Sequence, residues 1–455
     1  MADYNIRDFH AVGDGTHKDT VAIQATINAC AQGGGGRVVV PAGGVYVSGT
    51  LELKSNVDLY VERGAVLEAS GDEADFVHMH VDRPQMLNVY PNINQSIAFI
   101  IGYDLQNVAI TGGGVIDGGG RKFIVERLQH IYRMKQVRPF TFFFIGGSNI
   151  TFRDVTIRDG ALWTLRLSGC EDVLIDGIRI QNDLMLPNND GIDLDHCRHV
   201  RIVGCHIVAG DDCICLKTCG NAGSFGACEN ITVTGCTLIS TSCALIIGCE
   251  AHMPMRNVVF DSCVIQASHR GLGIHLSHEC DVENVIFSNM IIETRLFDEA
   301  WWGRAEPIYL CAVPWAADDT IGTIRNIRFT NVLCKGENGV FVYASEPDHI
   351  QNVLFEHVRV ELVKTSKWSA GRQDIRPCVG EGLPPHPTSG FMINNASDIT
   401  LRHCEVMWTG TLPDEYRYAL DCGGVVNGLL LDDFIGASAH PDHYPAIHQN
   451  APEAR

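Results

Sequence analysis

The stretch NITFRDVTIRDG, residues 149–160, decides the fold because related phrases recur along much of the chain. Each phrase holds two short runs of β-branched residues around a small or turn-forming residue. Successive copies from Asn149 to Asn284 begin 23 to 31 residues apart, with no helical pattern between them. Units of this period cannot bury an apolar face alone, so they must stack. The pattern predicts an all-β parallel β-helix in which each coil supplies about three strands. Copies also begin at Asn107, Asp172, His199, Asn230, Asn257, Asn326, Asn352 and Asp398.

The alternatives to this fold are an antiparallel sandwich and a propeller. Both need hairpin turns, and the Asn-led phrases lack them. The expected turn residues inside the copies are Gly204, Gly235, Ser262 and Asn289. Three cysteines in one phase of the repeat are expected to form a column that faces the interior or lines a turn, namely Cys205, Cys236 and Cys263.

The repeats suggest one domain, residues 1–455. Residues 1–60 are expected to hold an N-terminal cap and the first strands, and residues 100–435 the main coils. An open β-helix end would expose unpaired strand edges. The segment DTVAIQATINACA, residues 19–31, has apolar residues at helical spacing and is predicted to be a capping helix with Asp19 as its N-cap. Two stretched intervals predict insert loops at 295–320 and 364–390, and such loops often border a binding face.

Composition excludes several classes of partner. The net charge of −20 over 455 residues disfavours nucleic acid and anionic membranes. No apolar run is long enough to span a bilayer. The 18 cysteines are expected to be mostly reduced core residues, and Cys213, Cys215 and Cys219 lack the spacing of a zinc site, so we expect no metal and no cofactor. The N-terminal residues do not resemble a signal peptide, which favours the cytoplasm unless a signal was removed.

Adjacent carboxylates open a very apolar strand in VAGDDCICLK, residues 208–217. Asp211 and Asp212 follow Asp190 by about one coil, so the three should lie on neighbouring coils about 4.8 Å apart. Clustered carboxylates can combine a protonated acid with an ionised base, as glycoside hydrolysis requires. A calcium site or a solvated turn would explain the cluster without catalysis.

The motifs NNDGIDLD (188–195) and GDDCICLK (210–217) resemble those of glycoside hydrolase family 28, the polygalacturonase family. The resemblance covers roughly residues 5–435 and implies a right-handed parallel β-helix and an inverting hydrolysis. It implies that Asp211 is the general acid, that Asp190 and Asp212 hold and deprotonate the attacking water, and that Asn188 binds substrate.

The chain departs from the family where the family binds a uronate carboxylate. Cys243 stands in place of the motif histidine, and Gly273 and His275 stand in place of the Arg-x-Lys pair. A neutral His is a poor substitute for a fixed positive charge, so a neutral sugar becomes at least as reasonable a substrate. The candidates for substrate contacts, besides Asn188, are Lys217, Arg270, His275, Trp301, Trp302 and Glu306. The tryptophans suit stacking on a sugar ring, and their structural alternative is packing of their loop against the β-helix. The structural alternative for Glu306 is a contact that pins its loop.

The sequence therefore predicts a glycoside hydrolase that acts on a pectin-derived or related plant oligosaccharide, with the long inserts favouring attack at a chain end. Two alternatives remain open. A polysaccharide lyase or epimerase would share the fold but needs a group that neutralises the uronate. A glycan-binding β-helix without activity would bind substrate and not turn it over.

Overall fold

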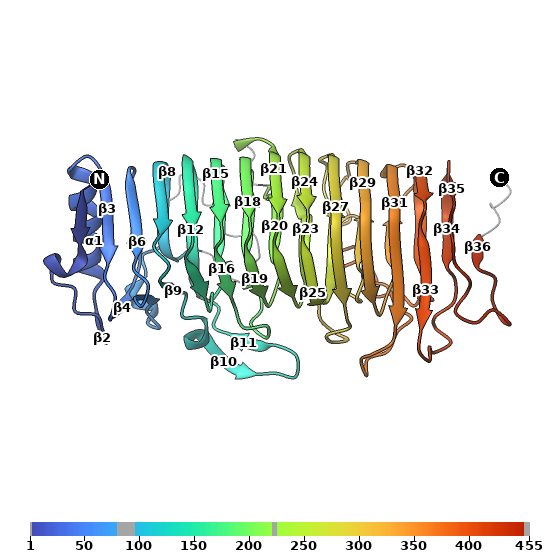
Figure 1. The fold of residues 1–455 in the computed structure, drawn as a ribbon, viewed down its shortest axis with the longest axis horizontal. Coiled ribbons are helices and arrows are strands. Elements are labelled where there is room, and N and C mark those ends of the chain that lie inside the picture. Colours follow the sequence, from blue (N-terminus) through green and yellow to red (C-terminus); the bar gives the residue numbers. More distant parts are fainter. Residues whose placement is uncertain (1, 80–95, 221–224, 450–455) are drawn as a thin grey trace. The chain divides into compact units, whose positions relative to one another are not determined.

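The computed structural model describes residues 2–79, 96–220 and 225–449 as coils of short parallel strands (Figure 1). The strands of each coil pair in parallel with those of the next, so the predicted parallel β-helix is confirmed. Two compact units divide the chain, residues 1–215 with 221–231 and residues 216–220 with 232–455.

The first unit contains the capping helix and the early coils. Its strands are β1 Asp3–Asn5, β2 Asp14–Lys18, β3 Gly36–Val40, β4 Val45–Ser48, β5 Leu51–Glu52, β6 Val57–Val61, β7 Val66–Ala69, β8 Ala98–Thr111, β9 Val115–Asp117, β10 Ile124–Arg127, β11 Tyr132–Met134, β12 Phe140–Arg153, β13 Thr156–Arg158, β14 Leu165–Ser168, β15 Glu171–Asp176, β16 Arg179–Gln181, β17 Ile192–Asp195, β18 Arg198–Val203 and β19 His206–Ala209. Its 3-10 helices are η1 Ile6–Phe9, η2 Glu73–Asp75 and η4 Gly120–Phe123.

Strands β20 Ile214–Thr218 and β21 Cys228–Thr234 cross the division between the units. The second unit continues with β22 Thr237–Ser240, β23 Cys243–Ala251, β24 Met255–Asp261, β25 Val264–Ser268, β26 Arg270–Leu276, β27 Val282–Thr294, β28 Ile308–Ala312, β29 Ile324–Gly336, β30 Val340–Ala344, β31 Ile350–Val363, β32 Phe391–Arg402, β33 Glu405–Thr409, β34 Leu420–Asn427, β35 Leu430–Asp432 and β36 Ile447–Gln449.

The Asn that leads each repeat phrase marks a corner of the coil. These asparagines have left-handed backbones, for example φ 57° at Asn107 and 55° at Asn149. Asn tolerates this conformation better than other residues with a Cβ. Their amides also bond from coil to coil, with Asn149 Nδ2 donating to Asn107 Oδ1 at 2.8 Å. The repeated Asn is therefore a requirement of the turn, and it sets the register of the stack.

A second left-handed corner separates the two strands of each phrase. The predicted turn residues occupy it, with φ 61° at Gly204, 66° at Gly235, 54° at Ser262 and 55° at Asn289. This confirms the turns read from the repeat.

Apolar side chains that alternate along the strands fill the interior of the coils. In the second unit Phe260, Phe287, Phe329 and Phe355 stack in register with ring centroids 4.9 to 5.0 Å apart. All 18 cysteines lie within the described residues and none of them forms a disulfide; all are buried except for the half-buried Cys249 and Cys378. The reading of cysteines as reduced core residues is therefore confirmed.

The capping helix α1, Thr20–Gln32, lies beside the first coil (Figure 1). It buries Ile23, Thr26, Ile27 and Cys30. Asp19 occupies the predicted N-cap position, but its side chain makes no capping hydrogen bond to the helix. Its carboxylate accepts the N–H groups of Val12 at 2.7 Å and Gly13 at 3.0 Å and thereby ties the preceding turn to the helix. Among the described residues, no helix has the length and apolar character needed to cross a membrane.

Candidate active site

Three aspartates converge in the first unit, as the coil spacing predicts. One carboxylate oxygen from each of Asp190, Asp211 and Asp212 lies within 4.8 Å of the others. These residues are 3%, 7% and 9% exposed. Like charges this close disfavour simultaneous ionisation, so such a cluster can retain a proton at neutral pH. The arrangement can supply a proton donor beside an ionised base.

Close backbone contacts join the two acid-bearing turns. Asn189 Oδ1 accepts the N–H of Gly210 at 2.7 Å, and the N–H of Gly191 donates to the carbonyl of Asp212 at 2.8 Å. A Cβ on Gly191 would lie 2.4 Å from the carbonyl oxygen of Cys213, and one on Gly210 would lie 2.5 Å from a backbone oxygen of the preceding turn. Both positions therefore need glycine, which explains the residues that flank the acids in the two motifs.

Arg138 is linked to this cluster, although sequence reasoning did not single it out. It is 3% exposed. Its Nη1 donates to the carbonyl oxygens of Ala161 and Pro187, both at 2.7 Å, and its Nη2 donates to Asn188 Oδ1 at 2.9 Å. The backbone N–H of Asn188 in turn donates to Asp211 Oδ2 at 3.2 Å. Arg138 thus holds the turn that supplies a hydrogen bond to an acid of the cluster.

The charge of Arg138 also acts on the acids. Burial lowers the pKa of Arg138 to about 10, while the negative charges of Asp190 and Asp211 oppose that shift. The guanidinium is therefore positive at neutral pH and offsets part of the charge of the cluster. The sequence did contain a pattern that could have identified Arg138. This arginine begins the apolar stretch RPFTFFFI, residues 138–145, just as Asp211 and Asp212 stand at the start of an apolar strand.

A divalent cation is another occupant that three carboxylate oxygens at this spacing could attract. Arg138 already places a positive charge beside two of them, which weakens electrostatic attraction for a second cation. This charge favours proton transfer over cation binding as the chemistry that the arrangement can support, and the absence of a required metal stays a prediction.

A second buried arginine in this unit was also missed. Arg166 and Asp195 are fully buried, and Arg166 Nη2 lies 3.2 Å from Asp195 Oδ2. The guanidinium carbon lies 4.4 Å from the ring centroid of Phe143 and 4.9 Å from that of Trp163. Breaking a buried pair of this kind leaves an uncompensated charge in the interior, so we regard it as structural.

Lys217, a predicted substrate contact, lies on β20 within the second unit. Its Nζ is 2.8 Å from Glu250 Oε2, and both side chains are almost fully buried. Its charge is therefore paired inside the protein.

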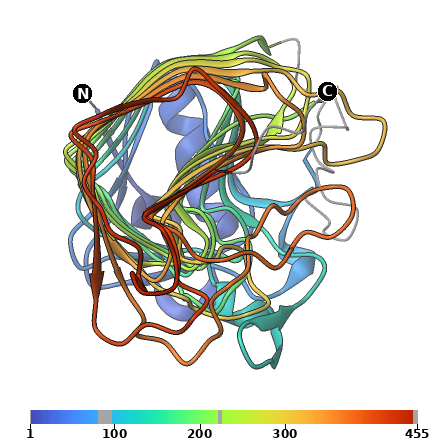
Figure 2. The same cartoon turned by 90° about the vertical axis from the view of Figure 1, so that its right-hand side faces the viewer.

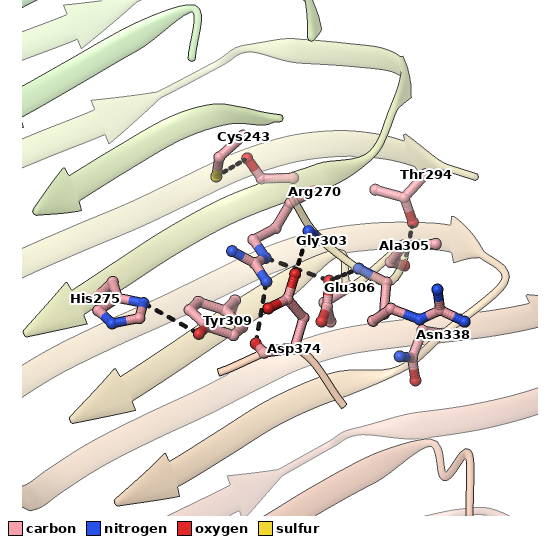
Figure 3. A network of polar contacts seen from close by, with 12 residues as sticks. Cys243, Arg270, His275, Thr294, Gly303, Ala305, Glu306, Tyr309, Asn338 and Asp374 are labelled. Atoms are coloured by element: carbon pink, nitrogen blue, oxygen red, sulfur yellow. Dashed lines mark hydrogen bonds and ion pairs between the residues drawn. The ribbon is translucent and has the colours of Figure 1, made fainter. Parts of the chain in front are cut away.

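Arg270 and Glu306 form the centre of a buried polar network in the second unit (Figure 3). Arg270 Nε donates to Glu306 Oε2 at 3.2 Å, and its Nη2 donates to the carbonyl of Asp374 at 3.3 Å. Glu306 Oε2 also accepts the N–H of Arg304 at 2.7 Å. Glu306 is fully buried, so these contacts favour the structural alternative, in which it pins its loop.

His275 lies beneath the 364–390 insert. Its Nε2 is 3.2 Å from the carbonyl oxygen of Pro377, and its Nδ1 is 3.2 Å from the hydroxyl of Tyr309. Burial and the nearby charge of Arg270 lower its pKa to about 3, so the ring is neutral at neutral pH. It does not supply the positive charge that the Arg-x-Lys pair would bring.

A larger side chain at Gly273, such as the arginine of the family motif, would be crowded by its neighbours. A Cβ at this position would lie 3.1 Å from Cys243 Sγ and 3.2 Å from Ile246 Cγ1. Cys243 and Ile246 therefore fill the space beside Gly273, and the substitutions at 243 and 273 complement each other.

The two predicted inserts interlock over the second unit. Arg376 donates to the carbonyl oxygens of Ala300 at 3.0 Å and Trp301 at 2.8 Å. The N–H of Gly303 donates to Asp374 Oδ2 at 2.7 Å, and Arg376 pairs with the same carboxylate at 2.8 Å. Figure 2 shows yellow and orange loops of this unit extending outside the stacked strands.

Apolar side chains continue this contact with the sheet. Ile375 packs with the strand residues Tyr309, Phe341 and Met392 in one cluster. Trp301 and Trp302 remain half-buried with ring centroids 6.2 Å apart, and Arg376 lies 5.0 Å from the ring centroid of Trp302. The inserts thus cover part of the outer sheet face in this unit, and their tryptophans retain exposed surface.

Replacing Asp374 with Ala should release the interlocked inserts. Burial alone would raise the pKa of Asp374, but hydrogen bonds from Arg376 and the charge of Arg270 hold this pKa below its usual value. Loss of this buried carboxylate leaves both arginines undercompensated, and we expect the free energy of unfolding to fall by about 3–5 kcal/mol. Denaturant unfolding measures the loss, and limited proteolysis should cut at 295–320 or 364–390 first. The exposed Asp318→Asn in the first insert is the matched control, and equal stability of the two variants would contradict the prediction.

The family model for Glycosyl hydrolases family 28 matches residues 30–300. A probable polygalacturonase of Vitis vinifera is 33% identical over 220 residues, covering 46% of this chain and 43% of the relative. An exo-poly-alpha-D-galacturonosidase of Dickeya chrysanthemi is 36% identical over 123 residues, covering 26% of this chain and 20% of the relative. The chain therefore spans less than half the length of these curated relatives.

A solved structure supports the fold independently. The family 28 exopolygalacturonase of Yersinia enterocolitica aligns with a TM-score of 0.70 at 18% identity, covering 96% of this chain and 79% of that one. At this identity the likeness shows the fold alone, a right-handed parallel β-helix.

Proposed function

Because the chain belongs to glycosyl hydrolases family 28, we propose that it hydrolyses glycosidic bonds in a pectin-derived oligosaccharide. The observation that carries the proposal is the convergence of Asp190, Asp211 and Asp212, each almost buried and each with a carboxylate oxygen within 4.8 Å of the others. The names of the matched relatives supply the substrate class, since they act on polygalacturonate-type chains.

In the proposed reaction Asp211 donates its proton to the oxygen of the leaving sugar. Asp190 and Asp212 hold a water molecule and accept its proton as the water oxygen bonds to the anomeric carbon. The bond from that carbon to the leaving oxygen breaks in the same step, and the anomeric configuration inverts. The roles of the three acids rest on the resemblance to the family.

Arg138 has a supporting role in this scheme. One proton shared among three carboxylic groups leaves two negative charges, and the guanidinium offsets one of them. Through Asn188 it also fixes the N–H that hydrogen-bonds to Asp211. We therefore regard Arg138 as a positioning residue.

The inserts support action at a chain end. The two inserts interlock over the outer sheet face of the second unit. This contact fixes the 295–320 insert, which carries the half-buried Trp301 and Trp302. Long insert loops on a solenoid often border a binding face, where they restrict the path of a long polymer. The tryptophans are the side chains in these inserts best suited to stack on a sugar ring.

The product profile tests this proposal. With a defined oligogalacturonate, we expect mono- or disaccharide to appear first and the parent chain to shorten step by step, as measured by chromatography over time. Reducing ends should rise without an unsaturated product that absorbs in the ultraviolet, which separates hydrolysis from elimination. Early products of intermediate length would contradict chain-end action, and NMR of the first anomer formed tests inversion.

A further inference from the structure

The first unit carries a hollow that the proposed reaction does not use. It has a volume of about 750 Å³ and lies at the coil corner between β12 and β13. Four arginines line it, Arg37, Arg63, Arg153 and Arg179, together with Asp58, Tyr60, Thr111 to Gly113, Asp154 to Thr156 and Gly177. The acid cluster instead precedes β17 and β20, so the hollow lies on another side of the coils.

Two of the four arginines are held by carboxylates. Arg37 Nε lies 3.1 Å from Asp58 Oδ2, and its guanidinium carbon lies 4.4 Å from the ring centroid of Tyr60. Arg153 Nε lies 3.0 Å from Asp176 Oδ2. These contacts orient the two side chains and neutralise much of their charge.

Arg63 and Arg179 differ from this pair. Both are exposed, and within the described residues neither forms an ion pair. The carboxylate of Asp58 is already occupied by Arg37 and by the hydroxyl of Thr111 at 2.7 Å, and Asp154 is the other acidic residue of the lining. In a chain with a net charge of −20, this hollow therefore has two guanidinium groups open to an anion.

The lining extends over several coils of the stack. Its residues come from five successive coils, represented by β3, β6, β8, β12 and β16, which pair in sequence through their strands. Neighbouring coils are separated by about 4.8 Å. The arginines come from four of these coils, and the two without an ion pair lie three coils apart, since Arg63 follows β6 and Arg179 begins β16. Cations spread along the stack suit an extended polymer that carries several carboxylates, because guanidinium groups pair well with carboxylates.

We infer that this hollow binds an acidic polysaccharide, with Arg63 and Arg179 contacting carboxylates of the same polymer chain. The inference rests on the proposed function for the class of polymer. The overall negative charge of the chain would repel a polyuronate, and this surface would hold the polymer while the acid cluster acts on its end.

Affinity electrophoresis tests the inference without turnover. The Asp211→Asn protein is run in native gels that contain polygalacturonate, and its retardation gives an affinity. The double variant Arg63→Gln/Arg179→Gln should bind about tenfold more weakly, because two charge-assisted contacts are lost. The control Arg127→Gln/Arg133→Gln makes the same charge change outside the hollow and should be retarded like the parent.

Three results would overturn the inference. Equal retardation of the double variant and the control would exclude the hollow, and equal retardation in neutral galactan would exclude carboxylate recognition. Release by inorganic phosphate beyond that caused by sodium chloride of equal ionic strength would show a general anion site. With Asp211 left unchanged, the double variant should hydrolyse a short oligosaccharide at the parental rate. Loss of polymer binding by the hollow and absence of the proposed hydrolysis therefore give different results.

Discussion

Replacing Asp211 with Asn should lower kcat by about 10²–10⁴-fold, because the amide has nearly the same shape and cannot donate the proton that the leaving oxygen needs. The N–H of Asn188 at 3.2 Å can still bond to the amide oxygen, so the turn should remain folded. Initial rates of reducing-sugar release measure the effect. Asp172→Asn, at an exposed Asp in the same unit, is the matched control and should retain the parental rate.

The leaving group distinguishes the acid from the other two carboxylates. A substrate with a phenol-type leaving group of low pKa needs little protonation, so Asp211→Asn should lose much less activity on it than on the natural bond. Asp190→Asn and Asp212→Asn should lose similar activity on both substrates, because they act on the water. A loss by Asp211→Asn that is independent of the leaving group would contradict its role as the general acid.

Replacing Arg138 with Met should affect both stability and the pH dependence of catalysis. The carbonyl oxygens of Ala161 and Pro187 would lose buried charge-assisted hydrogen bonds. We expect the free energy of unfolding to fall by about 3 kcal/mol, as measured by denaturant unfolding. Removing the positive charge makes ionisation of Asp190 and Asp211 less favourable, so the acidic limb of kcat/KM should move to higher pH.

Arg138→Lys separates the charge from the hydrogen bonds. It keeps a positive charge but cannot reproduce the fork that contacts three acceptors, so it should lose stability while its acidic limb stays near that of the parent. Arg133→Met, at an exposed ion pair, is the control. An unmoved acidic limb in Arg138→Met would mean that Arg138 acts only on folding.

The fold was largely predictable because the solenoid repeats one local backbone arrangement, short strands joined at left-handed corners. The left-handed corners at Asn149 and Gly204 each depend on residues close in sequence, and the same pattern recurs in every coil. Asp19 is the N-cap residue as predicted, but the partners of its carboxylate could not be predicted, for the opposite reason. Its carboxylate has two possible partners, and the choice of Val12 and Gly13 depends on how the first turn packs against the helix.

The site was predictable in part. The one-coil spacing from Asp190 to Asp212 was enough to expect that these acids meet. Glu306 and Arg270 are 36 residues apart in the chain, so their contact depends on how the intervening insert packs. The repeat pattern of the sequence does not encode that packing.

By itself, the sequence determined the coil, its corners and the meeting of the three acids, since each follows from a short pattern repeated at a nearly constant interval. Only the tertiary structure decided how Arg138 reaches the acid cluster, how Asp374 locks two inserts together, and where Arg63 and Arg179 share a hollow. The physical reason is that parallel stacking converts a regular interval into a fixed distance. The positions of long side chains and inserts instead follow from which buried charges and carbonyl groups find partners when distant segments pack together.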